Sequence, residues 1–207
     1  FGLSVYVNHP NGFTTVYAHL QKYNTRLAAY IKSAQYKAKS YEVDLFPKNN
    51  ELPVIEGEIL GYSGNSGSSG GPHLHFEIRD TKTEETINSN LFGISAHDNV
   101  KPTITSLYVY RLNEKPFSEH TPKQYFQLTG TAGNYQIKGV NSIRLFGEIG
   151  FGIVANDRHT GNSGLNGVYS IELKVDDKTV FKSTFERFSF DHTRGINSYI
   201  DYPGKAR

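Results

Sequence analysis

The stretch Ser69–Asp80, "SGGPHLHFEIRD", predicts a strand that begins directly after a glycine-rich turn. Apolar side chains occupy every second position, which is the period of a strand with one face toward the core. The alternate positions carry His73, His75 and Glu77, which we expect on the opposite face. Because residues two apart on a strand point the same way, one metal ion could approach both imidazoles.

The His-x-His spacing alone does not establish a metal site. Half-exposed strands carry such pairs without any metal, and zinc takes about four ligands, of which these histidines supply only two. The chain has no cysteine, so a metal would have to be held by histidines and carboxylates. The neighbouring sequence therefore has to decide between a metal site and two surface histidines.

Residues 3–20, "LSVYVNHPNGFTTVYAHL", predict a β-hairpin with its turn at His9-Pro10-Asn11-Gly12. We expect the second strand to alternate between a polar and an apolar face. The polar face would hold Thr15, Tyr17 and His19, and the apolar face Val16, Ala18 and Leu20.

A helix is predicted within residues 25–42, where alanine and lysine are frequent and apolar residues recur every three or four positions. Asn24 or Thr25 would cap its first turn. Residues 52–64 predict a return to strand structure, and residues 64–71, "GNSGSSGG", predict a loop.

From Asp98 onward the sequence predicts short strands and turns without helical periodicity. Residues 168–185 predict a hairpin with Asp176-Asp177 at its turn. We expect an Ig-like or fibronectin-like β-sandwich over residues 98–207, with a domain boundary between Ser95 and Pro102. The whole chain is therefore expected to be mainly β.

Charge and hydropathy exclude some partners. A net charge of +2 is too small to indicate a nucleic-acid-binding protein, so we expect no nucleic acid partner. No apolar run is long enough to span a membrane, so we expect no membrane span in this chain.

Taken together and in this order, "VYAHL" at residues 16–20 and "EGEILGYSGNSGSSGGPHLHFEI" at residues 56–78 resemble the lysostaphin-type (LytM-like) zinc endopeptidases. These enzymes cut peptide bonds in bacterial peptidoglycan. The resemblance implies an antiparallel β-sheet peptidase domain over residues 1–95. A helical insertion would lie at about 21–53, longer than the link that this family usually has. It also implies a location in the bacterial envelope, either periplasmic or secreted.

The resemblance implies a role for each histidine. His75 matches the zinc ligand, and His73 matches the general base that acts on metal-bound water. His19 matches the second catalytic histidine, which orients that water or stabilises the oxyanion. Imidazole suits these roles because it can accept and return a proton near neutral pH. Tyr17, Gly70 and Gly71 are expected to line the substrate groove.

One feature of the family is missing. The family also needs a His-x-x-x-Asp pair that supplies two more zinc ligands, and no histidine of this sequence is followed four residues later by aspartate. We expect that pair upstream of Phe1, in which case this chain alone would be inactive. The alternative is a catalytically inactive binding, activator or scaffold module. With either function, the insertion or the β-sandwich is the surface that we expect to contact an envelope protein partner.

Overall fold

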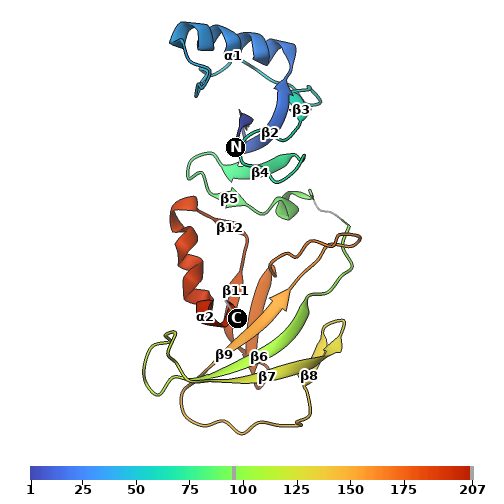
Figure 1. Ribbon diagram of the computed structural model, residues 1–207, viewed down its shortest axis with the longest axis vertical. Coiled ribbons are helices and arrows are strands. Elements are labelled where there is room, and N and C mark those ends of the chain that lie inside the picture. The colour runs from blue at the N-terminus through green and yellow to red at the C-terminus, as the bar shows by residue number, and fades with distance from the viewer. Residues whose placement is uncertain (95–96, 206–207) are drawn as a thin grey trace. The chain divides into compact units, whose positions relative to one another are not determined.

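The computed structural model describes residues 1–94 and 97–205, which divide into two compact units, 1–89 and 90–207 (Figure 1). Both units are built on antiparallel sheets, so the prediction of a mainly β chain is confirmed. We expected the domain boundary between residues 95 and 102. Residues 95–96 of that range lie outside the described residues. No helix of the described part combines the length and apolar character that a membrane crossing requires.

The first unit is an antiparallel sheet in which the long strand β2 is central. The sheet order is β1-β2-β4-β5, and β3 pairs with a further part of β2. The strands are β1 (Leu3–Asn8), β2 (Phe13–Tyr23), β3 (Gly61–Ser63), β4 (His75–Asp80) and β5 (Thr86–Ile87). Because β2 has neighbours along most of its length, its side chains form the best-buried part of the unit, with Val16 and Ala18 both 0% exposed.

The predicted hairpin between β1 and β2 is confirmed. The His9 amide donates to the carbonyl of Phe13 (2.8 Å), and the Gly12 amide donates to the carbonyl of His9 (3.1 Å). Gly12 has a φ of 87°, a conformation that glycine adopts without steric cost. The turn residues therefore set the register in which β2 meets β1.

A bulge in β2 overturns the prediction that His19 shares a face with Tyr17. Leu3 pairs with Leu20 and Val5 pairs with Tyr17, so β2 has one more residue between its two partners than β1 has. The extra residue breaks the alternation of side chains, and His19 lies in the left-handed region with a φ of 57°. The ring of Tyr17 packs on Phe76, 5.5 Å away, whereas the ring of His19 lies 5.5 Å from that of His75.

The predicted helix is confirmed as α1 (Thr25–Ala38), and Asn24 is its N-cap. The Asn24 Oδ1 accepts a hydrogen bond from the Leu27 amide (2.8 Å). The strand predicted over 52–64 is wrong except for β3. Pro53 brings no amide hydrogen to a ladder, and Gly57 turns the chain with a φ of 81°. A short 3₁₀ helix, η1 (Ser89–Phe92), follows β5.

The second unit contains a four-stranded antiparallel sheet with the order β8-β7-β6-β9. Its strands are β6 (Thr103–Arg111), β7 (Lys123–Thr131), β8 (Asn134–Ile137) and β9 (Ile149–Asn156). Val109 and Tyr110 of the central strand β6 are buried. The Ig-like identity of this unit stays a prediction.

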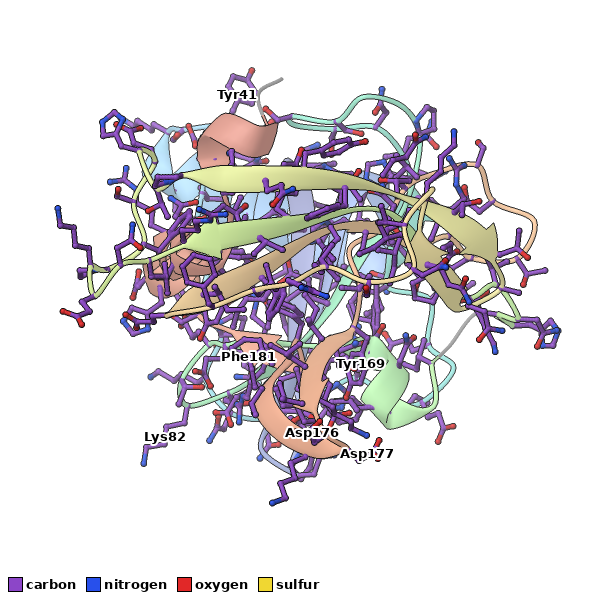
Figure 2. All side chains as sticks on the ribbon, turned by 90° about the horizontal axis from the view of Figure 1, so that it is seen from below. Tyr41, Lys82, Tyr169, Asp176, Asp177 and Phe181 are labelled. Atoms are coloured by element: carbon purple, nitrogen blue, oxygen red, sulfur yellow. The ribbon has the colours of Figure 1, made fainter. Side chains whose placement is uncertain are left out.

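A separate two-stranded sheet, β10 (Ser170–Val175) and β11 (Lys178–Thr184), confirms the hairpin predicted within 168–185. Asp176 and Asp177 form its turn (Figure 2), with φ values of 49° and 62°. Two positive φ values in succession match the twist of a tight hairpin, and aspartate tolerates them better than most residues.

The expectation of no helix after Asp98 is wrong. Beyond the short strand β12 (Arg187–Phe188), the chain forms the 3₁₀ helix η2 (Phe190–Tyr199) and the short helix α2 (Tyr202–Lys205). A 3₁₀ helix has three residues per turn, so a search for a period of 3.6 does not detect it.

Candidate metal centre

His19, His73 and His75 lie together at one end of the first unit's sheet. Each offers a ring nitrogen, and these atoms all lie within 4.8 Å of one another. His19 comes from the bulge of β2, and His75 opens β4. His73 stands just before β4, where it forms an isolated bridge with Gly64. Among the described residues, this is the cluster of histidines and carboxylates that could hold a metal ion.

The glycine-rich turn fixes the ring of His19. The His19 Nδ1 is 2.8 Å from the carbonyl oxygen of Ser66, which can only accept, so Nδ1 carries the proton. The Nε2 of His19 is then left with its lone pair. His19 is 6% exposed, so its ring is held on several sides rather than free to turn.

Close backbone contact brings Ser66 to that position. A Cβ on Gly67, whose φ is 73°, would lie 2.5 Å from the amide nitrogen of Gly2. The Leu3 amide also donates to the Ser66 hydroxyl (2.9 Å). The glycine-rich turn therefore uses Gly67 to let the backbone at Gly2 approach closely.

His73 is the exposed member of the cluster. Its Nδ1 donates to the carbonyl of Gly71 (2.8 Å), and the Ser69 hydroxyl lies 3.2 Å from the same nitrogen. The lone pair of His73 is therefore on Nε2, as in His19. An exposed imidazole with a free lone pair can exchange protons with solvent or with a bound molecule.

His75 is held by the opposite nitrogen. Its Nε2 lies 2.5 Å from Glu77 Oε1, which leaves Nδ1 as the nitrogen available to a metal. Glu77 Oε2 in turn accepts from Arg79 Nε (2.6 Å) and from the Thr86 hydroxyl (3.3 Å). Burial by itself would raise the pKa of Glu77, but the hydrogen bonds from Arg79 and His75 outweigh it and hold that pKa below its usual value.

The arrangement fits a metal ion that prefers nitrogen ligands. In each ring one nitrogen is engaged by a protein oxygen and the other is available. Nitrogens bound to one tetrahedral zinc at about 2.0–2.1 Å lie about 3.4 Å apart. The ring nitrogens of the three histidines lie within 4.8 Å of one another, a separation of the same order.

The structure separates the three residues expected in a substrate groove. Tyr17 pairs with Phe76 while the adjacent Ala18 pairs with His75, so Tyr17 lies on the face opposite His75, and its expected place beside His19 is wrong. Gly70 and Gly71 lie in the turn next to His73, and a Cβ added to either would meet nothing within 4 Å. Their place in a groove stays a prediction.

Ser66, Arg79 and Phe1 shape the site without having been predicted to do so. Ser66 acts through its backbone carbonyl, for which residue type carries no signal. Arg79 forms an ion pair with Glu77 on the same face of β4. The ring of Phe1 lies 5.0 Å from that of His75, and the carbonyl of Phe1 accepts from the His19 amide (3.1 Å), contacts that local sequence does not reveal.

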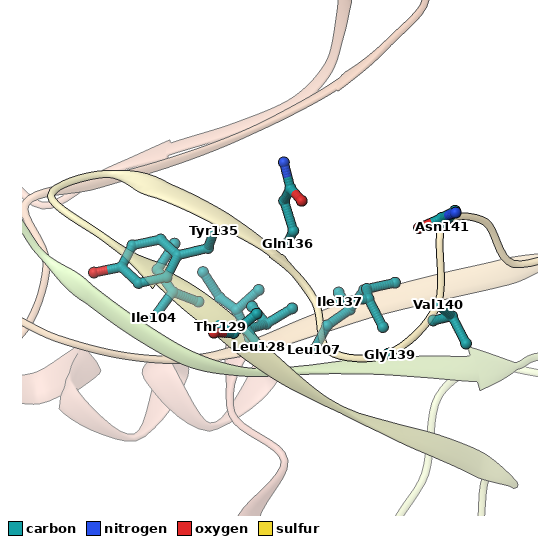
Figure 3. A pocket seen from close by; sticks show the side chains of 11 residues that line it. Ile104, Leu107, Leu128, Thr129, Tyr135, Gln136, Ile137, Gly139, Val140 and Asn141 are labelled. Atoms are coloured by element: carbon teal, nitrogen blue, oxygen red, sulfur yellow. The ribbon is translucent and has the colours of Figure 1, made fainter.

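A hollow of about 750 Å³ lies on the four-stranded sheet of the second unit (Figure 3). Leu107, Leu128 and Ile137 are among its lining residues, and none of the described lining residues is a histidine, a carboxylate or an amine. The described lining of this hollow therefore offers none of the side chains that usually bind a metal ion.

Comparison with known proteins finds one kind of relative. The chain is 32% identical over 79 residues to the DD-carboxypeptidase/endopeptidase Mpg of Neisseria meningitidis serogroup B, and equally so to the protein of that name from Neisseria gonorrhoeae. The aligned segment covers 38% of this chain but only 13% of the relative, so the chain spans a small part of the curated relatives it matches. No family model matches the chain, and no solved structure matches it.

Proposed function

We propose that this chain carries the histidine side of a zinc peptidase site that hydrolyses peptide bonds in bacterial peptidoglycan. The observation that carries the proposal is the convergence of His19, His73 and His75, each with one nitrogen engaged by the protein and one available. The similarity to a protein named as a carboxypeptidase and endopeptidase points to the same reaction class.

The residues would divide the work according to their surroundings. His75 would be a zinc ligand through Nδ1, since Glu77 occupies its other nitrogen. Zinc bound there would polarise a carbonyl group and lower the pKa of a water molecule. With His75 as one ligand, the other coordination positions would be filled by the two further ligands that the resemblance implies and by water or substrate.

His73 would serve as the general base, because it is exposed and its Nε2 lone pair is free to take a proton and later pass it to the leaving amine. His19 is buried and fixed by the Ser66 carbonyl. Once protonated at Nε2, it would donate a hydrogen bond to the oxygen that becomes negative as the peptide bond is attacked.

Peptidoglycan peptides as substrate, and with them a place in the bacterial envelope, rest on two supports. One is the resemblance of residues 16–20 and 56–78 to the lysostaphin-type enzymes. The other is the name of the relatives, which joins carboxypeptidase and endopeptidase activities.

The first test is zinc content together with hydrolysis of purified peptidoglycan, for the longest chain of this protein that can be expressed and for its His75→Ala variant. About one zinc per chain is expected, with zinc and hydrolysis both lost in the variant. His120→Ala is the matched control, since the His120 side chain is 88% exposed and lies in the other unit.

Because the resemblance implies two further ligands, the same assay is run on residues 1–207 alone, which should show no hydrolysis. Zinc bound without hydrolysis in the longest chain would favour the inactive binding or activator module. Neither zinc nor hydrolysis in either chain would overturn the enzyme reading.

A further inference from the structure

We propose that Glu77 is a positioning residue that sets the orientation and the tautomer of His75, and that Arg79 and Thr86 hold Glu77 in place for that task. The inference rests on the proposed metal site but not on the reaction at that site. It concerns which nitrogen of His75 faces the metal and how tightly the metal is held.

Both oxygens of the Glu77 carboxylate accept hydrogen bonds. Oε1 accepts from His75 Nε2 at 2.5 Å, and Oε2 accepts from Arg79 Nε at 2.6 Å and from the Thr86 hydroxyl at 3.3 Å. An ionised carboxylate accepts and cannot donate, so its partner nitrogen on His75 must carry the proton. Nδ1 is thereby the nitrogen of His75 left for a metal ion held with His19 and His73 nearby.

The network is buried, which makes its geometry rigid. The side chain of Glu77 is 7% exposed and that of Arg79 is 11% exposed. The Arg79 guanidinium also lies 5.9 Å from the ring of Phe1 and 5.5 Å from that of Tyr6, which shield it from water. A charged pair held at these distances away from water has little freedom to rearrange.

Strands β4 and β5 hold the four residues of this network next to one another. His75, Glu77 and Arg79 project from the same face of β4 because they are two residues apart. Thr86 is brought alongside by β5, where it pairs with Arg79. The sheet therefore aligns the metal ligand, the carboxylate and the guanidinium in a row, and the order of this row is set by the backbone.

The first measurement uses the metal-free wild-type chain. Long-range ¹H–¹⁵N NMR spectra of the imidazoles distinguish the two tautomers. The proton of His75 is expected on Nε2, whereas the protons of His19 and His73 are expected on Nδ1. A His75 found with its proton on Nδ1 would overturn the proposal without any variant.

The second measurement is the affinity for Zn²⁺ in Glu77→Gln. The amide of glutamine would present a donor to either His75 or Arg79, so the ring of His75 would lose its fixed orientation. Zn²⁺ affinity is expected to fall about 10- to 100-fold, which is usual when the partner of a metal-bound histidine is removed. The NMR signal of His75 should shift toward a mixture of tautomers while that of His19 stays unchanged.

Glu58→Gln is the matched control. It breaks an ion pair with Arg26 (2.6 Å) in the same unit and does not touch the histidines, so its Zn²⁺ affinity should equal that of the wild type. A folded Glu77→Gln that binds Zn²⁺ as tightly as the wild type would overturn the inference. If the Zn²⁺ affinity of Glu77→Gln falls as expected but the protein does not hydrolyse peptidoglycan, that result counts only against the proposed function.

Discussion

At the scale of single residues, two backbone conformations build the cluster. His19 adopts a φ of 57°, and this bulge moves its ring from the side of Tyr17 to the side of His75. Gly67, with a φ of 73°, lets the turn press against Gly2 so that the Ser66 carbonyl reaches His19. The geometry of the site thus depends on backbone conformation, at Gly67 as much as at His19 itself.

Gly67→Ala tests this dependence. An added Cβ would sit 2.5 Å from a backbone nitrogen in a left-handed conformation, and the strain is expected to cost about 1–3 kcal/mol of the first unit's stability. The midpoint of urea unfolding measures the loss. Gly70→Ala lies in the same turn with open space around it, so its stability should stay within about 0.5 kcal/mol of the wild type. Equal midpoints for the two variants would contradict this account of the turn.

At the scale of elements, helix α1 combines a favourable start with an unfavourable end. Asn24 caps its first turn, and its Nδ2 also donates to the carbonyl of Ile59 (2.7 Å), which ties the helix to the chain that returns toward β3. At the other end, Lys39 occupies the left-handed position with a φ of 52°, where glycine is usual. Leu27 is the buried residue of this helix, so its stability relies strongly on its ends.

Lys39→Gly is therefore expected to stabilise α1 by up to about 1 kcal/mol, because glycine adopts the left-handed conformation without a Cβ clash. Lys37→Gly removes the same charge from within the helix and should instead cost about 1 kcal/mol. Amide hydrogen exchange across residues 25–38 reports both changes. Protection that moves in the same direction in both variants would contradict the proposed strain at Lys39.

At the scale of the whole molecule, contacts between residues distant in sequence fix Asp201 against the strands of the second unit. Asp201 accepts hydrogen bonds from Tyr110 (2.7 Å) and Lys123, which lie 91 and 78 residues earlier. Its other carboxylate oxygen accepts from the Gly204 amide in α2 (3.1 Å). Burial by itself would raise the pKa of Asp201, but the hydrogen bonds from Lys123 and Tyr110 outweigh it and hold that pKa below its ordinary value of 3.8.

The lowered pKa of Asp201 predicts a pH dependence. A carboxyl group with a lower pKa in the folded state contributes its full stability above its unfolded-state pKa, and this contribution is lost as pH falls through the folded-state pKa. Asp201→Asn should therefore be less stable than the wild type by about 1–3 kcal/mol at neutral pH. The gap should close as pH falls below about 4.

Thermal unfolding from pH 7 to pH 2 measures the gap between Asp201→Asn and the wild type. Asp191→Asn, an exposed aspartate of the same unit, is the control and should follow the wild type throughout. A gap that does not change with pH would show that the Asp201 carboxylate is not the group that titrates.

The sequence by itself determined the turns and caps, because each of them depends on only a few neighbouring residues. The turn at His9–Gly12, the cap at Asn24 and the hairpin at Asp176-Asp177 were all predictable, because turn and cap preferences depend on backbone conformations a few residues wide. Strand alternation also correctly placed His75 and Glu77 on one face of β4.

Only the tertiary structure decided how the site closes. The bulge at His19 arises from the register between β1 and β2, and strict alternation along β2 would have put this ring on the wrong face. The carbonyl of Ser66 and the hydroxyl of Thr86 reach the cluster from other segments. The sequence alone thus named the three histidines, whereas the choice of free nitrogen on each ring came from contacts between segments, because hydrogen-bond partners are set by distance in space and not along the chain.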